Sequence, residues 1–386
     1  MSIFMGSTPY PIHGAGIAWS DLLKSTWAGY KQRFIYCGDP CAKAQGLVHD
    51  PSTGYTSVSE GIGYGLLMAV TMNDQATFND IYQAAEQILL DKLTGLYNWK
   101  VDQAATIIGF GAATDADQDI AVALIFAEQR VKAGEWQQNQ RADNAYGVRA
   151  SALIDALYRY TLYQGKYLLP GNKWLGNGMD ITNPSYFAPA WYRLYDKFQN
   201  TTRWQAVIDQ GYTSLYANEG APLGLAPDWM SVDGQSASEF CQKIGIPADG
   251  CKFEMTYDAI RVPWRIGLDC LWFSEARACE WSKRTVTFLH SLKNPVTDAK
   301  MFDMAGQSVI GYQDELMLGM WLTAAIAAKD EALQNKLSLR LSDFTGHAAK
   351  DGFWGSKPDS GQYYFSQSLA WFGVAMLTGD FKNLYP

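Results

Sequence analysis

Two kinds of helical segment alternate along this chain, and their alternation limits what the chain can fold into. One kind is apolar on every face, as in SEGIGYGLLMAVTM, DELMLGMWLTAAIAA and YYFSQSLAWFGVAMLTG. The other kind has a charged face, as in ATFNDIYQAAEQILLDKL and RWQAVIDQGYTSLY. Helices that are apolar all round belong inside a protein, and helices with one apolar face belong at its surface. Six inner and six outer helices would form an all-α (α/α)6 barrel, whose inner helices all run in one direction.

About twelve segments have helical length and pattern. They begin near Trp19, Ser57, Gln75, Asp115, Asn144, Pro184, Arg203, Tyr257, Ala276, Gln313, Ala332 and Tyr363. No linker or sharp change of composition interrupts them, so we expect one domain over residues 19–386. Residues 1–18 are interpreted as an N-terminal extension or an expression remnant. An irregular all-α fold around one core is the alternative, since no sequence repeat supports the barrel.

Charge and hydropathy exclude two classes of partner. The net charge of −8 would repel the phosphates of nucleic acids. No apolar run approaches the roughly 18 residues that span a bilayer. The 14 Trp, 22 Tyr and 17 Phe supply many flat apolar faces with polar tips, which suit ligands such as sugar rings. For any single Trp, however, filling the helical core is the more common role.

The six cysteines fall into three pairs that are close in sequence, which favours local disulfides and an oxidising compartment. The predicted pairs are Cys37–Cys41, Cys241–Cys251 and Cys270–Cys279. Zinc is the competing interpretation, but the chain has no CxxC motif and only four His. We expect a secreted protein, extracellular or periplasmic. Residues 1–14 lack the basic and apolar regions of a signal peptide.

Polar residues of the predicted inner helices lie near the starts of those helices. They are Ser59-Glu60, Asp115-Ala116-Asp117, Tyr257-Asp258 and Tyr363-Tyr364. If the inner helices are parallel, their first turns meet at one rim of the barrel. Scattered acids would then form a single site.

Hydrolysis of a glycosidic bond needs one protonated and one ionised carboxyl group. Glu60 is the candidate acid because a carboxyl on a crowded rim has a raised pKa. It precedes Gly61, Gly63 and Gly65, and glycines in a helix indicate close approach to its backbone. The alternative is an ordinary first-turn Glu that favours the helix dipole. A phosphate loop is excluded, since GxxxxGK[ST] is absent.

Two other acidic sites are candidates. Asp115 and Asp119 share a helix face in ATDADQDIA. The segment lacks the pattern of a calcium-binding loop. The alternative to a catalytic role is that Thr114 or Asp115 simply caps the helix. Asp258 has Arg261 one turn away, which could keep it ionised or form an ordinary ion pair. The sequence has no HExxH and no GxSxG motif. It therefore lacks the catalytic motifs typical of metalloproteases and serine hydrolases.

These segments resemble glycoside hydrolase family 8. The match covers ATDADQDIAVALIFA, SEGIGYGLLMAV, YDAIRVPWR and PSYFAPAWYRLY, in the family's order. The resemblance implies an (α/α)6 barrel and an inverting mechanism that needs no metal or other cofactor. It points to the endoglucanase-containing subgroup, whose general base is an Asp in the YDA position.

The resemblance also implies roles for single residues. Glu60 matches the general acid, Asp258 the general base, and Asp115 the third carboxylate, which holds the distorted sugar. The matching substrate-binding positions are Trp99, Trp191, Tyr257 and Arg261, and we add Tyr363 and Tyr364 as candidate subsite tyrosines. The two carboxyl groups are expected about 6.5–9.5 Å apart, as inversion requires.

The expected function is cleavage of internal β-1,4 bonds in cellulose or mixed-linkage β-glucan, by a monomer acting on a polysaccharide. A chitosanase or a xylanase on the same scaffold is the alternative. The loops CGDPC and Cys241–Cys251 depart from the family pattern and leave the polymer open. A polysaccharide-binding protein without catalysis is a remote alternative, because no catalytic carboxylate is missing.

Overall fold

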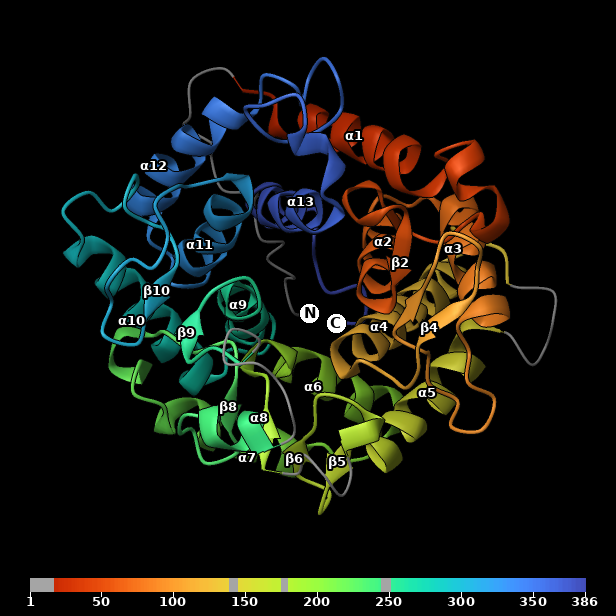
Figure 1. Cartoon of the computed structure of the whole chain (residues 1–386), viewed down its shortest axis with the longest axis horizontal. Helices are drawn as coiled ribbons and strands as arrows, with labels where there is room; N and C mark the ends of the chain where they lie inside the picture. The colour runs from red at the N-terminus through yellow and green to blue at the C-terminus, as the bar shows by residue number, and fades with distance from the viewer. Residues whose placement is uncertain (1–16, 139–144, 175–179, 244–250) are drawn as a thin grey trace, which may run out of the picture.

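The computed structural model describes residues 17–138, 145–174, 180–243 and 251–386. Within them, twelve helices of eleven or more residues form two concentric rings (Figure 1). The inner helices are α2 (Ser59–Thr71), α4 (Thr114–Lys132), α6 (Pro189–Gln199), α9 (Val262–Phe273), α11 (Glu315–Ala327) and α13 (Tyr364–Thr378). The outer helices are α1 (Trp19–Tyr30), α3 (Gln75–Ile88), α5 (Tyr146–Tyr160), α7 (Gln205–Ala217), α10 (Ala276–Ser291) and α12 (Glu331–Leu341). The prediction of an (α/α)6 barrel is confirmed.

Sequence order and spatial order agree around the barrel. The outer helices α3, α5, α7, α10 and α12 each pack against an inner helix that is a neighbour in sequence, and α13 closes the ring against α1 and α2. Burial follows the pattern of apolar residues: every residue of α11 is buried, as are the first fourteen of α4. The predicted extension, residues 1–18, lies outside the described residues except for its last two positions.

Ten of the twelve predicted helix starts fall within two residues of the observed ones. The start predicted near Pro184 is wrong: a 3-10 turn at Pro184–Tyr186 precedes α6, which begins at Pro189. Proline disfavours helical geometry in the residue before it, here Ala188, so the helix cannot begin earlier. The start predicted near Tyr257 is also wrong, since a 3-10 turn at Ala259–Arg261 leads into α9.

Short antiparallel strands and turns lie between the helices. One sheet joins β1 (His49–Asp50), β2 (Thr56–Val58), β3 (Lys100–Val101) and β4 (Ile107–Gly109). The two-stranded pairs are β5 (Leu162–Tyr163) with β6 (Tyr167–Leu168), β7 (Ile181–Thr182) with β8 (Met230–Ser231), and β9 (Glu254–Met255) with β10 (Phe302–Asp303). A six-residue helix, α8 (Ser238–Lys243), and a π-helical turn, Lys31–Ile35, complete the larger elements.

Aromatic rings fill the middle of the barrel. Trp264 stacks on Phe372 with their ring centroids 4.6 Å apart, and Tyr64 lies edge-on to both. Phe381, in the C-terminal segment, packs against the same two rings. The barrel is therefore a packed core and not a channel, which leaves its rim as the place for a ligand.

Three disulfides have the predicted pairing: Cys37–Cys41, Cys241–Cys251 and Cys270–Cys279. The third bridge joins inner helix α9 to outer helix α10. Of the helices in the described residues, none has the length and apolar character needed to cross a membrane.

Candidate active site

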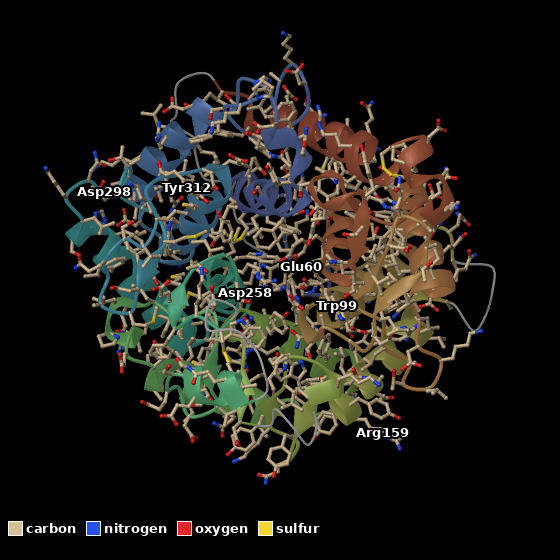
Figure 2. All side chains as sticks on the ribbon, viewed as in Figure 1. Glu60, Trp99, Arg159, Asp258, Asp298 and Tyr312 are labelled. Atoms are coloured by element: carbon tan, nitrogen blue, oxygen red, sulfur yellow. A yellow bond between two sulfur atoms is a disulfide. The ribbon has the colours of Figure 1, made fainter. Side chains whose placement is uncertain are left out.

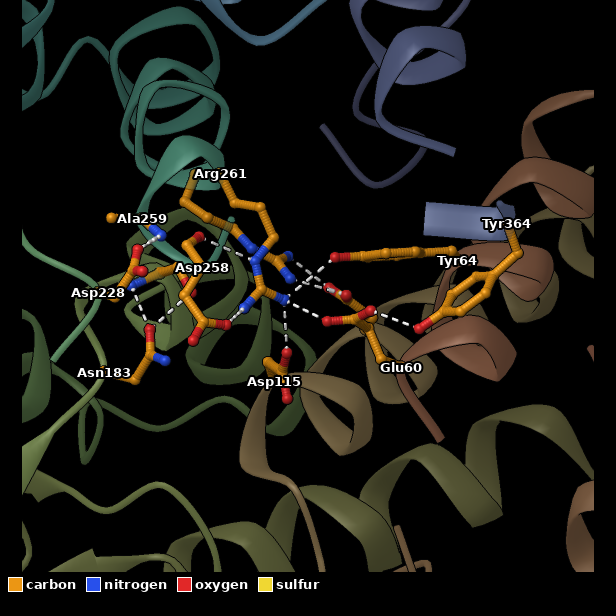
Figure 3. Close-up of polar contacts among 12 residues, drawn as sticks. Glu60, Tyr64, Asp115, Asn183, Asp228, Asp258, Ala259, Arg261 and Tyr364 are labelled. Carbon is orange, nitrogen blue, oxygen red and sulfur yellow. Dashed lines mark hydrogen bonds and ion pairs between the residues drawn. The ribbon is translucent and has the colours of Figure 1, made fainter. Parts of the chain in front are cut away.

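The first turns of α2, α4 and α13 meet the turn before α9 at one end of the barrel, and one arginine connects them (Figure 3). Nη1 of Arg261 lies 2.6 Å from Oε2 of Glu60 and 2.7 Å from Oδ2 of Asp115. Nη2 of Arg261 lies 2.8 Å from Oδ1 of Asp258. These carboxylates come from positions 60, 115 and 258, and only the barrel brings them together.

Arg261 is fully buried, and three carboxyl groups pair with its guanidinium. Its Nε donates to the backbone oxygen of Asp258, which fixes the guanidinium plane relative to that residue. The ring of Tyr186 lies 5.5 Å from the guanidinium carbon, within the range of a cation–π contact. A fork of fixed N–H donors suits such multiple pairing better than the point charge of Lys.

Glu60 has the properties of a general acid. Burial raises the pKa of its carboxyl to about 7, although Arg261 and the hydroxyl of Tyr364 both act to lower it. Tyr364 donates this hydrogen bond to Oε1 over 2.8 Å. A carboxyl with a pKa near neutrality can carry a proton at working pH and release it in the reaction.

Asp258 is the most exposed of the three carboxylates, with 35% of its side chain accessible, against 18% for Glu60 and 1% for Asp115. It lies just before the 3-10 turn at Ala259–Arg261, outside any helix. An ionised, partly exposed carboxylate beside a fixed cation is suited to take a proton from water. The whole guanidinium of Arg261 lies between Asp258 and Glu60.

Asp115 has one carboxylate oxygen that is buried without a hydrogen-bond partner. Its Oδ2 pairs with Arg261, whereas its buried Oδ1 has no hydrogen-bond partner. Burial raises the pKa of this carboxyl against the lowering effect of Arg261. A buried polar atom without a partner is unfavourable, and a sugar hydroxyl would supply the missing hydrogen bond.

A second ion pair lies one turn deeper in the barrel. Arg265 of α9 binds both carboxylate oxygens of Asp119, so Arg261, just before α9, and Arg265 face Asp115 and Asp119 of α4 at the same i, i+4 spacing. Gly63 makes room for this pair, since a Cβ there would lie 2.8 Å from Cβ of Asp119. The glycines that follow Glu60 thus serve close packing within the protein, as the structure shows for Gly63.

The structure contradicts the prediction that Trp191 stacks on a sugar. Trp191 is fully buried, its indole N–H donates to Asp119 over 2.7 Å, and its ring packs against Trp264 and Trp272. The resemblance to the family pattern suggested a stacking position, but the side chain is buried in the core. It supports the deeper ion pair instead.

Three other predicted aromatic positions are exposed. The exposed fractions are 41% for Trp99, 44% for Tyr257 and 46% for Tyr363. Trp99 lies near the middle of the ring together with Glu60 and Asp258 (Figure 2). Its ring packs flat against Gly109, where any Cβ would clash at 2.4 Å, and its backbone oxygen accepts the N–H of Ser59. The indole is therefore fixed relative to the start of α2.

Tyr364 is buried, and its hydroxyl is engaged by Glu60, so its place is beside the acid and not on the surface of the rim. Sequence reasoning placed Asp117 among the polar residues at the helix starts but gave it no role, and it did not single out Asp228. Asp117 accepts the N–H of Tyr97 and so holds the segment that carries Trp99. Asp228 supports the segment of Asp258. No local pattern reveals these two roles, because each residue acts on a segment distant in sequence.

We expect Tyr364→Phe to shift the alkaline limb of the activity profile to higher pH. The Tyr364 hydroxyl stabilises the ionised form of Glu60 and thereby lowers its pKa. Without that hydroxyl the pKa of Glu60 rises above about 7, so the acid stays protonated to higher pH. Profiles of kcat/KM between pH 5 and 9 measure the shift, with Tyr363→Phe as the matched control. An unchanged or lower limb would contradict this coupling.

Among the described residues, no cluster of three or more His, Cys, Asp and Glu side chains is arranged to hold a metal ion. The rim presents carboxyls, one guanidinium, hydroxyls and aromatic rings. Glycosidic hydrolysis by acid and base needs two carboxyl groups that flank the scissile bond, and Glu60 and Asp258 are two carboxyls of different exposure that pair with one arginine.

Comparison with known proteins agrees with this chemistry. The sequence model for "Glycosyl hydrolases family 8" matches residues 13–379. The chain is 31% identical to Endoglucanase A of Acetivibrio thermocellus, over 98% of this chain and 74% of that protein. It is 31% identical to Endoglucanase 2 of Ruminiclostridium josui, over 95% of this chain and 73% of that protein.

Solved structures share the fold. A β-1,3-1,4-glucanase from Paenibacillus sp. X4 superposes with a TM-score of 0.76 at 23% identity, over 95% of this chain and 94% of that one. Rex8A from Paenibacillus barcinonensis, complexed with xylose, gives 0.75 at 19% identity, over 96% of each chain. The family match spans the whole barrel and every residue of the rim described above. The chain therefore belongs to glycosyl hydrolase family 8.

Proposed function

We propose that this protein is an endoglucanase that cleaves internal β-1,4 bonds of cellulose or mixed-linkage β-glucan with inversion. The observation that carries the proposal is the pairing of Glu60, whose pKa is about 7, with the exposed carboxylate Asp258 across Arg261. The names of relatives at 30–31% identity, all endoglucanases, support the choice of polymer.

In the proposed reaction, Glu60 donates its proton to the glycosidic oxygen as the bond from that oxygen to the anomeric carbon breaks. Asp258 takes a proton from a water molecule on the opposite face of the sugar, and the water oxygen bonds to the anomeric carbon. The products are two shorter chains, and the new reducing end has the α configuration. Asp115 accepts a hydroxyl of the sugar through its free Oδ1.

Inversion requires room for a water molecule between the base and the sugar, hence a carboxyl spacing of about 6.5–9.5 Å. The position of the Arg261 guanidinium between Glu60 and Asp258 supports this longer spacing, because it keeps the two carboxyls out of contact. A nucleophile in a retaining enzyme would stand closer to the acid, at about 5–5.5 Å.

A neutral polymer fits the rim better than cationic chitosan. Two further carboxyl groups belong to the inner-helix starts and their loops. They are those of Asp228 and Glu315, and each of these residues is only 5% exposed. The predicted substrate-binding residues that are exposed are aromatic instead: Trp99, Tyr257 and Tyr363. Flat aromatic faces bind the C–H faces of glucose rings without needing charge.

We also propose that residues 19–386 form a single catalytic domain, which acts as a monomer after secretion. The continuous ring of helices supports one domain, and the three disulfides support an oxidising compartment.

Reducing-sugar release from carboxymethylcellulose, barley β-glucan, xylan and chitosan, with EDTA present, tests the proposal. We expect cleavage of the two glucans and a rapid fall in viscosity, because cuts fall inside the chains. Activity on xylan or chitosan alone would overturn the proposed choice of polymer but not the proposed roles of Glu60, Asp258 and Asp115. Loss of all activity on adding EDTA would overturn a mechanism based on carboxyls alone.

A further inference from the structure

We propose that Asp228 is the positioning residue of the general base: its buried carboxylate clamps the turn that carries Asp258 and thereby sets the direction of the base. The inference rests on the proposed role of Asp258. Nothing in the sequence motifs marks Asp228, which lies thirty residues before the base in the segment that leads into β8.

The clamp consists of hydrogen bonds on both sides of the base. Oδ1 of Asp228 accepts the backbone N–H of Thr256 over 2.9 Å and that of Ala259 over 2.7 Å. Oδ2 accepts the hydroxyl of Thr256. One carboxylate therefore fixes the backbone two residues before Asp258 and one residue after it. Figure 3 shows the second of these contacts, between Asp228 and Ala259.

Asp228 is itself held firmly. Its own N–H donates to the backbone oxygen of Glu254 over 2.7 Å, and the N–H of Trp229 donates to Lys252 over 3.1 Å. On the other side, the Glu254–Met255 strand pairs with Phe302–Asp303. The side chain is 5% exposed, so water cannot easily replace its bonds. A rigid anchor of this kind transmits its position to the turn it binds.

The turn needs such an anchor, because Asp258 is not part of a helix or strand. Its side chain is 35% exposed, and Arg261 pairs with its carboxylate. Without Asp228, the N–H groups of Thr256 and Ala259 lose their acceptor, and the turn would rearrange to find others. A displacement of about 1 Å at a catalytic group can cost about 10²-fold in rate.

The charge of Asp228 argues for a role beyond folding. Burial, and then the neighbouring charge of Asp258, raise the pKa of Asp228 to about 6. Two carboxylates side by side repel each other, so a neutral acceptor would hold the turn with less strain. Asp258 in turn pairs with Arg261, which also pairs with Glu60 and Asp115. A carboxylate at this position therefore serves to orient the general base and does not serve stability alone.

Kinetics of Asp228→Ala and Asp228→Asn on β-glucan test the clamp. We expect Asp228→Ala to lower kcat about 10²-fold while KM stays within about threefold, because substrate contacts are not touched. Asp228→Asn should recover at least tenfold of that loss, because its amide oxygen can still accept both N–H groups. The matched control is Asp303→Ala, since the Asp303 carboxylate accepts the N–H groups of Ala305 and Gln307 in its own turn, whereas its contact with Glu254 of β9 is a backbone strand pairing that Ala keeps.

Hydrogen exchange of peptides covering residues 256–261 is measured in the same proteins. We expect faster exchange there in Asp228→Ala, an intermediate rate in Asp228→Asn and no change in Asp303→Ala. An unchanged kcat, a loss in KM alone, or an Asn variant no better than Ala would each overturn the inference. If Asp228→Ala does not fold, the Asn variant and its exchange rates decide. A wild-type enzyme inactive on glucans would refute the proposed function, whereas the exchange data would still judge the clamp.

Discussion

Glu60→Gln and Asp258→Asn are each expected to lower kcat on β-glucan by about 10²–10⁴-fold while leaving the fold intact. Gln cannot donate the proton that the leaving oxygen needs, and Asn cannot take a proton from water. Both changes are isosteric, and neither leaves a larger cavity. Steady-state kinetics and thermal unfolding of the two variants measure the effects, with Glu280→Gln on the outer helix α10 as a neutralised control.

A substrate with a good leaving group separates the two roles. An aryl β-cellooligosaccharide whose phenolate leaves without protonation should restore much of the activity of Glu60→Gln. It should not restore Asp258→Asn, because attack by water still lacks its base. Wild-type turnover in either variant would refute its assignment, and rescue of Asp258→Asn instead of Glu60→Gln would exchange the two roles.

Arg261→Met is expected to abolish turnover and to reduce the free energy of unfolding by about 3–5 kcal/mol at neutral pH. Removing the guanidinium leaves Glu60, Asp115 and Asp258 facing one another without a cation. Chemical denaturation and kcat on β-glucan are the measurements. Arg149→Met is the matched control, because Arg149 forms a buried pair with the single carboxylate Glu86. We expect that control to lose stability but to keep most of its kcat.

The effect of Arg261→Met should depend on pH in a definite direction. Arg261 lowers the pKa of both Glu60 and Asp115, so its loss raises both values in the folded protein. Carboxyls with a raised folded pKa contribute stability below their unfolded pKa of about 4, and that stability is lost as the pH rises through the folded value. The stability gap between wild type and variant should therefore be larger at pH 8 than at pH 5. An equal gap at both values would show that the three carboxylates do not depend on the arginine.

The helical pattern was sufficient to predict the barrel, because burial on all faces or on one face is a property of each segment alone. The two errors in helix starts came from Pro184 and Tyr257, where 3-10 turns precede the helix. In the second case the turn is held by a carboxylate from a distant loop, Asp228, which no local propensity registers. Local rules thus failed where tertiary hydrogen bonds set the backbone near the site.

The sequence also named the three carboxylates, through their positions at helix starts and their resemblance to a family pattern. It identified Arg261 as a partner of Asp258 at i, i+3, but not its bridge to Glu60, 201 residues away. Trp191 was misjudged because a match to a family pattern does not reveal which way a side chain points. Contacts across the barrel become visible only once the inner helices are placed side by side.

The configuration of the first products tests the central claim most directly. Proton NMR of cellohexaose during the first minutes of hydrolysis distinguishes the anomers at the new reducing ends before they equilibrate. A direct displacement by water, with Glu60 as acid and Asp258 as base, predicts that the α anomer appears first. Initial release of the β anomer would contradict the account, because it would require a covalent intermediate and a carboxylate acting as nucleophile.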